Sequence, residues 1–110
     1  MGITKSEIYT TEQNLVATYA KVLGHPARIA ILQELVDRKS CVCGELVNEI
    51  GLAQATISQH LKELKQANLI IGEVDGTSVC YCINAQKWNE LKKMFSSLFG
   101  SLKKGKFKCC

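Results

Sequence analysis

The sequence has 110 residues, of which 46% are hydrophobic and 22% charged, and these proportions are typical of one soluble globular domain with a single core. No apolar run approaches the ~20 residues that a membrane-spanning helix needs. The N-terminal residues lack the hydrophobic core of a secretion signal, so we expect a cytoplasmic protein. The net charge of +4 comes from four lysines in the last ten residues, so charge alone does not indicate a nucleic-acid partner. We therefore divide the chain into a domain at residues 1–102 and a basic, cysteine-ending tail at residues 103–110.

Six cysteines provide the main chemical signal of the sequence. Their share of the residues is below the roughly 8–10% of a disulfide scaffold, and without a secretion signal a set of three disulfides is not expected. In a reducing cytosol, cysteines in close pairs are more often ligands or redox thiols. None of the pairs has the CxxC spacing of a zinc knuckle or a thioredoxin-type site. The pairs are Cys41/Cys43, Cys80/Cys82 and Cys109/Cys110.

Two helices are predicted at the start of the chain. Residues 6–23 carry an apolar stripe at helical spacing, and Gly24 ends this helix. Pro26 suits the first turn of the next helix, because the missing N–H of proline would be unpaired there in any case. The side chains that this second helix is expected to bury are Ile29, Leu32, Leu35 and Val36.

A helix-turn-helix is predicted next. A short helix at residues 44–50 is followed by a turn at Gly51 and by a longer helix from Gln54 to about residue 67. The longer helix is expected to bury Ile57, Leu61 and Leu64 and to leave its polar side chains outside. Two helices joined by a glycine-bearing turn of about three residues are typical of a helix-turn-helix.

A hairpin and a final helix complete the predicted fold. Asp75-Gly76 lies between two alternating runs, at residues 69–74 and 78–83, which is a strong hairpin signal. A helix at residues 85–102 follows. The fold class is therefore mainly α with a β-hairpin wing (α+β), a winged helix-turn-helix.

The longer helix of the helix-turn-helix is the predicted DNA-reading element, because the N-terminal half of such a helix meets base edges in the major groove. Its Gln, Ser, Thr and His side chains can contact bases or phosphates, and its lysines can contact the DNA backbone. The alternative is the polar outer face of an ordinary helix, and the lack of arginine on this face counts against DNA. The predicted DNA-binding residues are Gln54, Thr56, Ser58, Gln59, His60, Lys62 and Lys65.

A homodimer is expected for two reasons. The final helix carries a seam of apolar residues spaced like a coiled coil, with little of its own chain left to cover it. One DNA-reading helix covers only a few base pairs, whereas two helices held about 34–36 Å apart read a palindrome. The predicted interface residues are Leu15, Tyr19, Trp88, Leu91, Phe95 and Leu98.

Cys41 and Cys43 are the strongest candidates for an ion site. On a helix, residues i and i+2 point about 200° apart, but in an extended segment both lie on one side. Cys43 would also lie at a helix N-terminus, which lowers the pKa of a thiol. Two thiolates form a soft site that suits arsenite, antimonite, cadmium or lead over hard cations. The alternative is a pair of small buried residues in a short strand.

Four segments of the sequence together resemble the ArsR/SmtB family of winged-helix metalloregulatory repressors, over about residues 13–98. They are LGHPARIAILQEL at 23–35, CVCGEL at 41–46, GLAQATISQHLKELKQANLI at 51–70 and GTSVCYCIN at 76–84. The resemblance implies a homodimer that represses its own operon until an effector ion binds. It also implies that Cys41 and Cys43 bind trivalent arsenic or antimony, as in the arsenic-sensing branch. A further cysteine found in some members is absent, and the zinc-type site on the last helix has no counterpart, because residues 88–102 contain neither His nor Asp.

Trivalent arsenic favours three sulfur ligands, so the third ligand is open. Cys80 and Cys82 alternate on the second strand of the wing and are expected to be half-buried packing residues. Cys109 or Cys110 is the preferred candidate, because the tail from residue 100 could span roughly 30 Å at ~3.3 Å per residue. The alternative for these two is a terminus with spare thiols.

Two other functions stay open beside the arsenic-responsive repressor. One is a thiol-redox or persulfide-sensing repressor on the same scaffold. The other is a cysteine-rich metal-buffering protein, against which the helix-turn-helix and wing count. An enzyme is not expected, because the sequence has no nucleophile–base pair, phosphate loop or credible carboxylate pair. No organic cofactor is expected.

Overall fold

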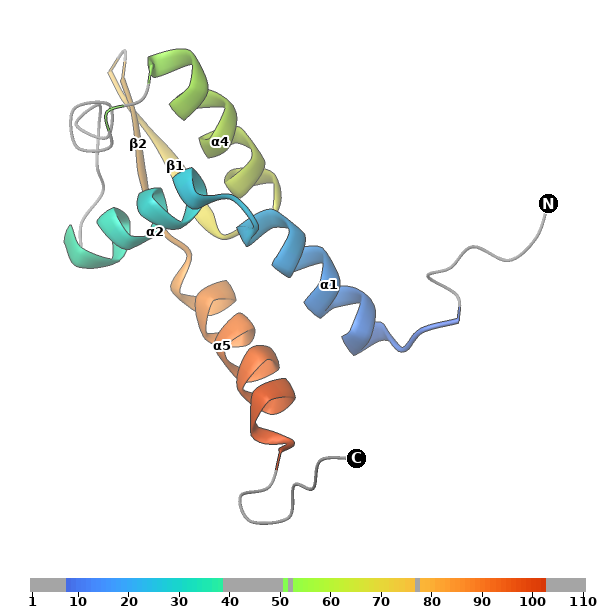
Figure 1. Ribbon diagram of the computed structural model, residues 1–110. Coiled ribbons are helices and arrows are strands. Elements are labelled where there is room, and N and C mark those ends of the chain that lie inside the picture. The colour runs from blue at the N-terminus through green and yellow to red at the C-terminus, as the bar shows by residue number, and fades with distance from the viewer. Residues whose placement is uncertain (1–7, 39–50, 52, 77, 103–110) are drawn as a thin grey trace.

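The computed structural model describes residues 8–38, 51, 53–76 and 78–102, which form four helices and one two-stranded antiparallel hairpin (Figure 1). The elements are α1 (Thr11–Leu23), α2 (Pro26–Arg38), α4 (Gln54–Gln66), β1 (Ile70–Asp75), β2 (Ser78–Ile83) and α5 (Ala85–Gly100). The predicted mainly helical fold with a hairpin wing is confirmed. The short helix predicted at residues 44–50 lies outside the described residues. No described helix is long and apolar enough to cross a membrane.

The elements divide between two ends of the molecule. The hairpin and α4 lie together at one end, and α1 and α5 extend away from them toward the other (Figure 1). Helix α2 lies between these parts and contacts α1, α4 and β2. The helix predicted to read DNA and the wing are therefore neighbours, while the two helices predicted to form the dimer are grouped apart from them.

Helix α1 begins at Thr11, later than the periodicity of residues 6–23 predicts. Thr10 and Gln13 form a capping box: the N–H of Gln13 donates to Thr10 Oγ1 at 3.0 Å, and the N–H of Thr10 donates to Gln13 Oε1 at 2.9 Å. This reciprocal pair satisfies two backbone donors that the first turn of a helix leaves unpaired. The cap thus sets the start of α1, and residues 8–10 are not helical.

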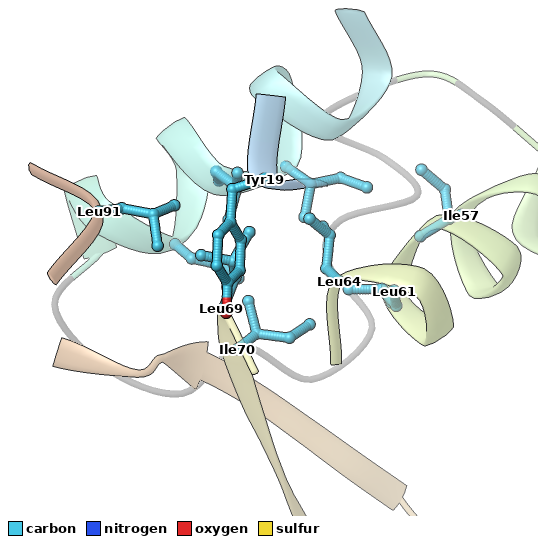
Figure 2. Close-up of a cluster of buried hydrophobic side chains, with 10 residues drawn as sticks. Tyr19, Ile57, Leu61, Leu64, Leu69, Ile70 and Leu91 are labelled. Atoms are coloured by element: carbon cyan, nitrogen blue, oxygen red, sulfur yellow. The ribbon is translucent and has the colours of Figure 1, made fainter. Parts of the chain in front are cut away.

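One hydrophobic cluster joins all four described helices to the hairpin (Figure 2). Helix α4 contributes Ile57, Leu61 and Leu64 at the i, i+4, i+7 spacing of one helix face, as predicted. The turn after α4 adds Leu69, and β1 adds Ile70. The other members of the cluster are Tyr19, Ile31, Leu32, Leu35 and Leu91.

The prediction that Ile29 and Val36 of α2 are buried is wrong, since both are exposed. They are seven residues apart and therefore share one side of the helix, whereas Ile31, Leu32 and Leu35 define the buried side. Ile29 and Val36 line an open cavity of about 740 Å³ that Leu23 and Trp88 also border.

The wing is a regular antiparallel hairpin whose turn contains Gly76, while Asp75, predicted as a turn residue, is the last residue of β1. Ile70 pairs with Ile83 at one end of the register and Asp75 with Ser78 at the other. Gly76 has a φ of 63°, in the left-handed region that a two-residue hairpin turn requires and that glycine adopts without strain. The hairpin prediction is therefore confirmed, although β1 begins and ends one residue later than the predicted run at residues 69–74.

A polar junction fixes α4 against the turn between α1 and α2. Arg28 Nε donates to His60 Nδ1 at 3.1 Å, and Arg28 Nη1 donates to the carbonyl oxygen of Val22 at 3.1 Å. The rings of His25 and His60 lie with their centroids 4.4 Å apart. His60 is only 8% exposed. Because Arg28 stays protonated, His60 must keep Nδ1 unprotonated to accept this hydrogen bond.

Burial lowers the pKa of His60 from its ordinary value of 6.5, and the neighbouring His25 and Arg28 lower it further, while Glu63 opposes them. The folded state therefore favours neutral His60. Below about pH 6.5 the unfolded chain binds this proton more readily, so stability is present above that pH and is lost as the pH falls.

We expect a His60→Asn variant to lose part of this acid sensitivity, because an amide oxygen can accept from Arg28 but does not titrate. Urea midpoints measured at about pH 7.5 and about pH 5.5 test this. The wild-type midpoint should fall more than that of His60→Asn between the two pH values. Equal falls would show that the junction does not contribute to acid sensitivity.

Candidate nucleic-acid interface and thiol site

The outer face of α4 carries the polar side chains that the sequence predicts to contact DNA. Gln54 is the first residue of the helix. The predicted residues whose side chains are exposed are Thr56, Ser58, Gln59, Lys62 and Lys65. Because the opposite face is buried in the core, these side chains are presented to solvent from a fixed helix.

Two of these side chains are held by neighbours. Gln59 Nε2 donates to Glu63 Oε1 at 3.1 Å, which orients the amide and leaves its oxygen free to accept. Lys65 leans toward the hairpin, where its Nζ lies 3.3 Å from the position that a Cβ on Gly72 would take. Lys65 therefore lies between α4 and the wing, and Gln59 and Lys62 point from the helix surface.

His60 lies on the inner face of α4, so the prediction that it contacts DNA is wrong. Its position is three residues after Ile57 and four before Leu64, so it continues the apolar stripe of the helix. Its ring is buried and its Nδ1 accepts from Arg28. The helical spacing of His60 indicates this inward position, whereas the polar character of histidine favours the outer face.

The start of α4 is electropositive. Ala53 is the N-cap residue and makes no side-chain hydrogen bond to the helix, and the first turn has no acidic residue. The backbone N–H groups of a first turn point along the helix axis and carry a partial positive charge. Such a helix end favours an anion such as a phosphate group.

The thiols are only partly within the described residues. Cys41, Cys43, Cys109 and Cys110 lie outside them, so the structure does not test the predicted ion site. Cys82 is half-buried and has a free thiol, as expected for a packing residue. Cys80 differs from the expectation, because it is 6% exposed and disulfide-bonded. In the part of the chain that is described, no three His, Cys, Asp or Glu side chains gather as a metal site.

The residues predicted for the dimer interface divide into two groups. Tyr19 and Leu91 belong to the buried core of the chain itself, so they stabilise the protomer. Leu15 and Leu98 are exposed, as is Phe99 with 73% of its surface. Trp88 and Phe95 are half-buried and line a shallow apolar cavity of about 260 Å³. Of the predicted interface residues, the two that are exposed therefore lie on α1 and near the end of α5.

Known proteins share this sequence and fold. Residues 25–71 match the family described as "Bacterial regulatory protein, arsR family". The chain is 36% identical over 112 residues to the arsenical resistance operon repressor of Bacillus subtilis, and the match covers 100% of both chains. It is 39% identical over 77 residues to an uncharacterized HTH-type transcriptional regulator of Mycobacterium tuberculosis, covering 70% of this chain and 68% of that protein.

Solved structures have a similar fold. The crystal structure of NolR from Sinorhizobium fredii superposes with a TM-score of 0.65 at 26% identity, covering 91% of this chain and 97% of that one. The chain belongs to the arsR family of bacterial regulatory proteins, whose members here are transcriptional regulators and not enzymes.

Proposed function

We propose that the protein is a homodimeric repressor that binds operator DNA and releases it when trivalent arsenic or antimony binds cysteine thiolates. The observation that carries this proposal is the division of α4 into a buried inner stripe and an exposed polar face. The match to an arsenical resistance operon repressor over the full length of both chains supports the choice of effector. The regulators among its relatives support transcription control as the process.

DNA would be read by α4. Thr56, Ser58 and Gln59 lie in the N-terminal half of the helix, which is the part that enters the major groove in a helix-turn-helix. A glutamine amide can pair bidentately with adenine, and hydroxyl groups reach bases or phosphates. The uncapped, electropositive start of α4 suits a backbone phosphate. The hairpin beside α4 would contact the flanking DNA as the wing.

Two copies would associate through α1 and α5. Leu15, Leu98 and Phe99 are exposed in the protomer, and burying such apolar surface is the usual driving force of association. Pairing places the two copies of α4 on one side of a symmetric dimer, where they can read two half-sites about 34–36 Å apart.

The effector would bind the thiolates of Cys41 and Cys43, which precede the DNA-reading helix in the sequence. Soft thiolates prefer trivalent arsenic or antimony, and also cadmium or lead, over hard cations. Binding then favours the arrangement of the dimer that has lower DNA affinity. Each tenfold loss of operator affinity needs about 1.4 kcal/mol of such coupling.

A thiol-redox sensor on the same scaffold is the second candidate. The disulfide at Cys80 favours it, because it makes one cysteine of the wing part of an oxidised pair. In this case an oxidant, and not arsenite, would release the operator.

Substitutions on α4 should separate base contacts from phosphate contacts. Gln59→Ala should weaken binding to the DNA upstream of the gene by about 1–3 kcal/mol and leave binding to unrelated DNA unchanged. Lys62→Gln should weaken binding to both and reduce the salt slope by about one. Fluorescence anisotropy over a salt series measures both effects. Lys93→Gln, an exposed lysine of α5, is the control, and binding by Lys62→Gln equal to this control would contradict the assignment.

Removal of the exposed apolar side chains of α5 should dissociate the dimer. We expect Leu98→Ala/Phe99→Ala to sediment as a monomer at concentrations where the wild type is a dimer, and to lose operator affinity. Both side chains are exposed in the protomer, so its unfolding midpoint should change little. Ile71→Ala, which removes an exposed side chain from the hairpin, should remain a dimer. A double variant that stays dimeric would exclude this surface.

Arsenite should release the wild-type protein from the operator in the presence of a phosphine reductant. The Cys41→Ser/Cys43→Ser variant should stay bound, because it lacks both thiolates. Fluorescence anisotropy on labelled operator DNA measures release. If arsenite leaves the wild type bound, or still releases the double variant, the effector assignment is wrong. Release by an oxidant alone would favour the redox sensor.

A further inference from the structure

We propose that Arg28 is a positioning residue for operator binding, because its guanidinium joins the last turn of α1 to the inner face of α4. In the dimer this junction sets the separation and the angle of the two copies of α4, and hence the spacing of half-sites that the protein accepts. The inference rests on the proposed function, in which α4 reads DNA and α1 lies at the dimer interface.

Arg28 lies between the helix assigned to the dimer and the helix assigned to DNA. The main contacts of α1 are with α2 and α5, and those of α4 are with α2 and β1. Helix α2 directly follows α1 in the chain and lies against α4 (Figure 1). Arg28 is on the first turn of α2. Its side chain therefore provides a direct link between α1 and α4.

The first hydrogen bond of Arg28 holds the end of α1. Its Nη1 donates to the carbonyl oxygen of Val22 at 3.1 Å. Val22 is one of the last four residues of α1, whose carbonyl groups have no partner within the helix. The positive charge of the guanidinium also complements the negative end of the helix dipole. The bond therefore ties Arg28 to a part of α1 that needs a donor.

The second hydrogen bond of Arg28 holds α4. Its Nε donates to Nδ1 of His60 at 3.1 Å, and His60 is buried in the apolar stripe of α4. The donors of a guanidinium lie in one rigid plane, so the two bonds fix their two acceptors relative to each other. Apolar contacts are non-directional, whereas a hydrogen bond weakens steeply as its angle changes. The stripe therefore keeps α4 in the core, and the bond from Arg28 fixes its rotation.

The turn that carries Arg28 is itself held by hydrogen bonds. The N–H of His25 donates to the carbonyl oxygen of Leu23 at 2.8 Å, and the N–H of Arg28 donates to the carbonyl oxygen of His25 at 3.0 Å. Nδ1 of His25 accepts from the N–H of Ala27 at 3.1 Å, and its ring lies 4.4 Å from that of His60 between centroids. A rotation of α1 is therefore transmitted to α4 and not taken up by the turn.

A symmetric dimer converts this junction into a measure of half-site spacing. Each α4 is tied to α1 of its own protomer, and the two copies of α1 meet across the dimer. Two reading helices about 34–36 Å apart fit half-sites one turn of DNA apart. One added base pair moves a half-site by about 3.4 Å and rotates it by about 34–36°. A dimer with fixed helices therefore loses base contacts that a loosened dimer keeps.

The test measures the ratio of affinities for two DNA duplexes by fluorescence anisotropy. One duplex carries the symmetric site that footprinting delimits in the DNA upstream of the gene. The other carries the same site with one base pair added at its centre. Because unfolded protein forms neither complex, a variant that is only less stable lowers both affinities equally and leaves their ratio unchanged.

Three variants alter the junction in different ways. Arg28→Lys keeps the charge and lacks the planar fork. His60→Leu keeps the buried stripe and removes the acceptor, whereas His60→Asn keeps an acceptor, because Oδ1 is bonded to Cγ as Nδ1 is in histidine. Arg38→Lys is the matched control, since it changes the arginine at the other end of α2, which pairs with exposed Glu34 at 3.2 Å.

We expect the wild type to prefer the native duplex by about tenfold or more, because losing the contacts of one base pair typically weakens binding by about tenfold. Arg28→Lys and His60→Leu should lower this preference by about threefold or more, which is within the range measured for residues in one hydrogen-bond network. His60→Asn and the Arg38→Lys control should keep the wild-type ratio.

Two results would overturn the inference: a wild-type ratio in both Arg28→Lys and His60→Leu, or an equal fall of the ratio in His60→Asn. A wild type that binds both duplexes equally would also overturn it, because half-site spacing would then not be selected. A wild type that protects no site in the upstream DNA would instead refute the proposed function.

Discussion

The buried stripe of α4 is the contact on which the rest of this structure depends. Ile57, Leu61 and Leu64 are packed in the same cluster as residues of α2 and β1, and His60 extends the stripe by accepting a hydrogen bond from Arg28. The opposite side of α4 carries mainly polar, exposed side chains, so this single apolar stripe determines the orientation of the helix. The polar face is therefore presented outward as a consequence of packing, and DNA reading needs no separate element to position it.

The same packing explains how a small ion can act on DNA binding. A close-packed helix does not deform gradually, so an effector must bias one arrangement of packed elements against another. The wing is coupled to both neighbouring helices, because β2 pairs with β1 along its length and is followed by Asn84. The Asn84 side chain donates to the carbonyl oxygen of Asn68, just after α4, and caps α5.

The sequence predicts the elements better than it predicts which residues face inward. Gly76 specifies the hairpin, because a tight turn between two alternating strands needs a residue with a positive φ. The polarity of His60 predicts an exposed side chain, but its spacing along the apolar stripe of α4 determines its burial. Tyr19 and Leu91 lie in the core of the protomer, since periodicity marks an apolar stripe without specifying which surface covers it. Cys80 could not be placed, since its environment depends on contacts distant in the sequence.

The central claim is that the repressor proposed here responds to trivalent arsenic through the thiolates of Cys41 and Cys43. The arsenic X-ray absorption spectrum of the reduced wild-type protein with one equivalent of arsenite tests it most directly. The account predicts sulfur neighbours around arsenic in the wild type and their loss in Cys41→Ser/Cys43→Ser. A wild-type spectrum with oxygen neighbours alone, or a sulfur signal unchanged in the double variant, would contradict it.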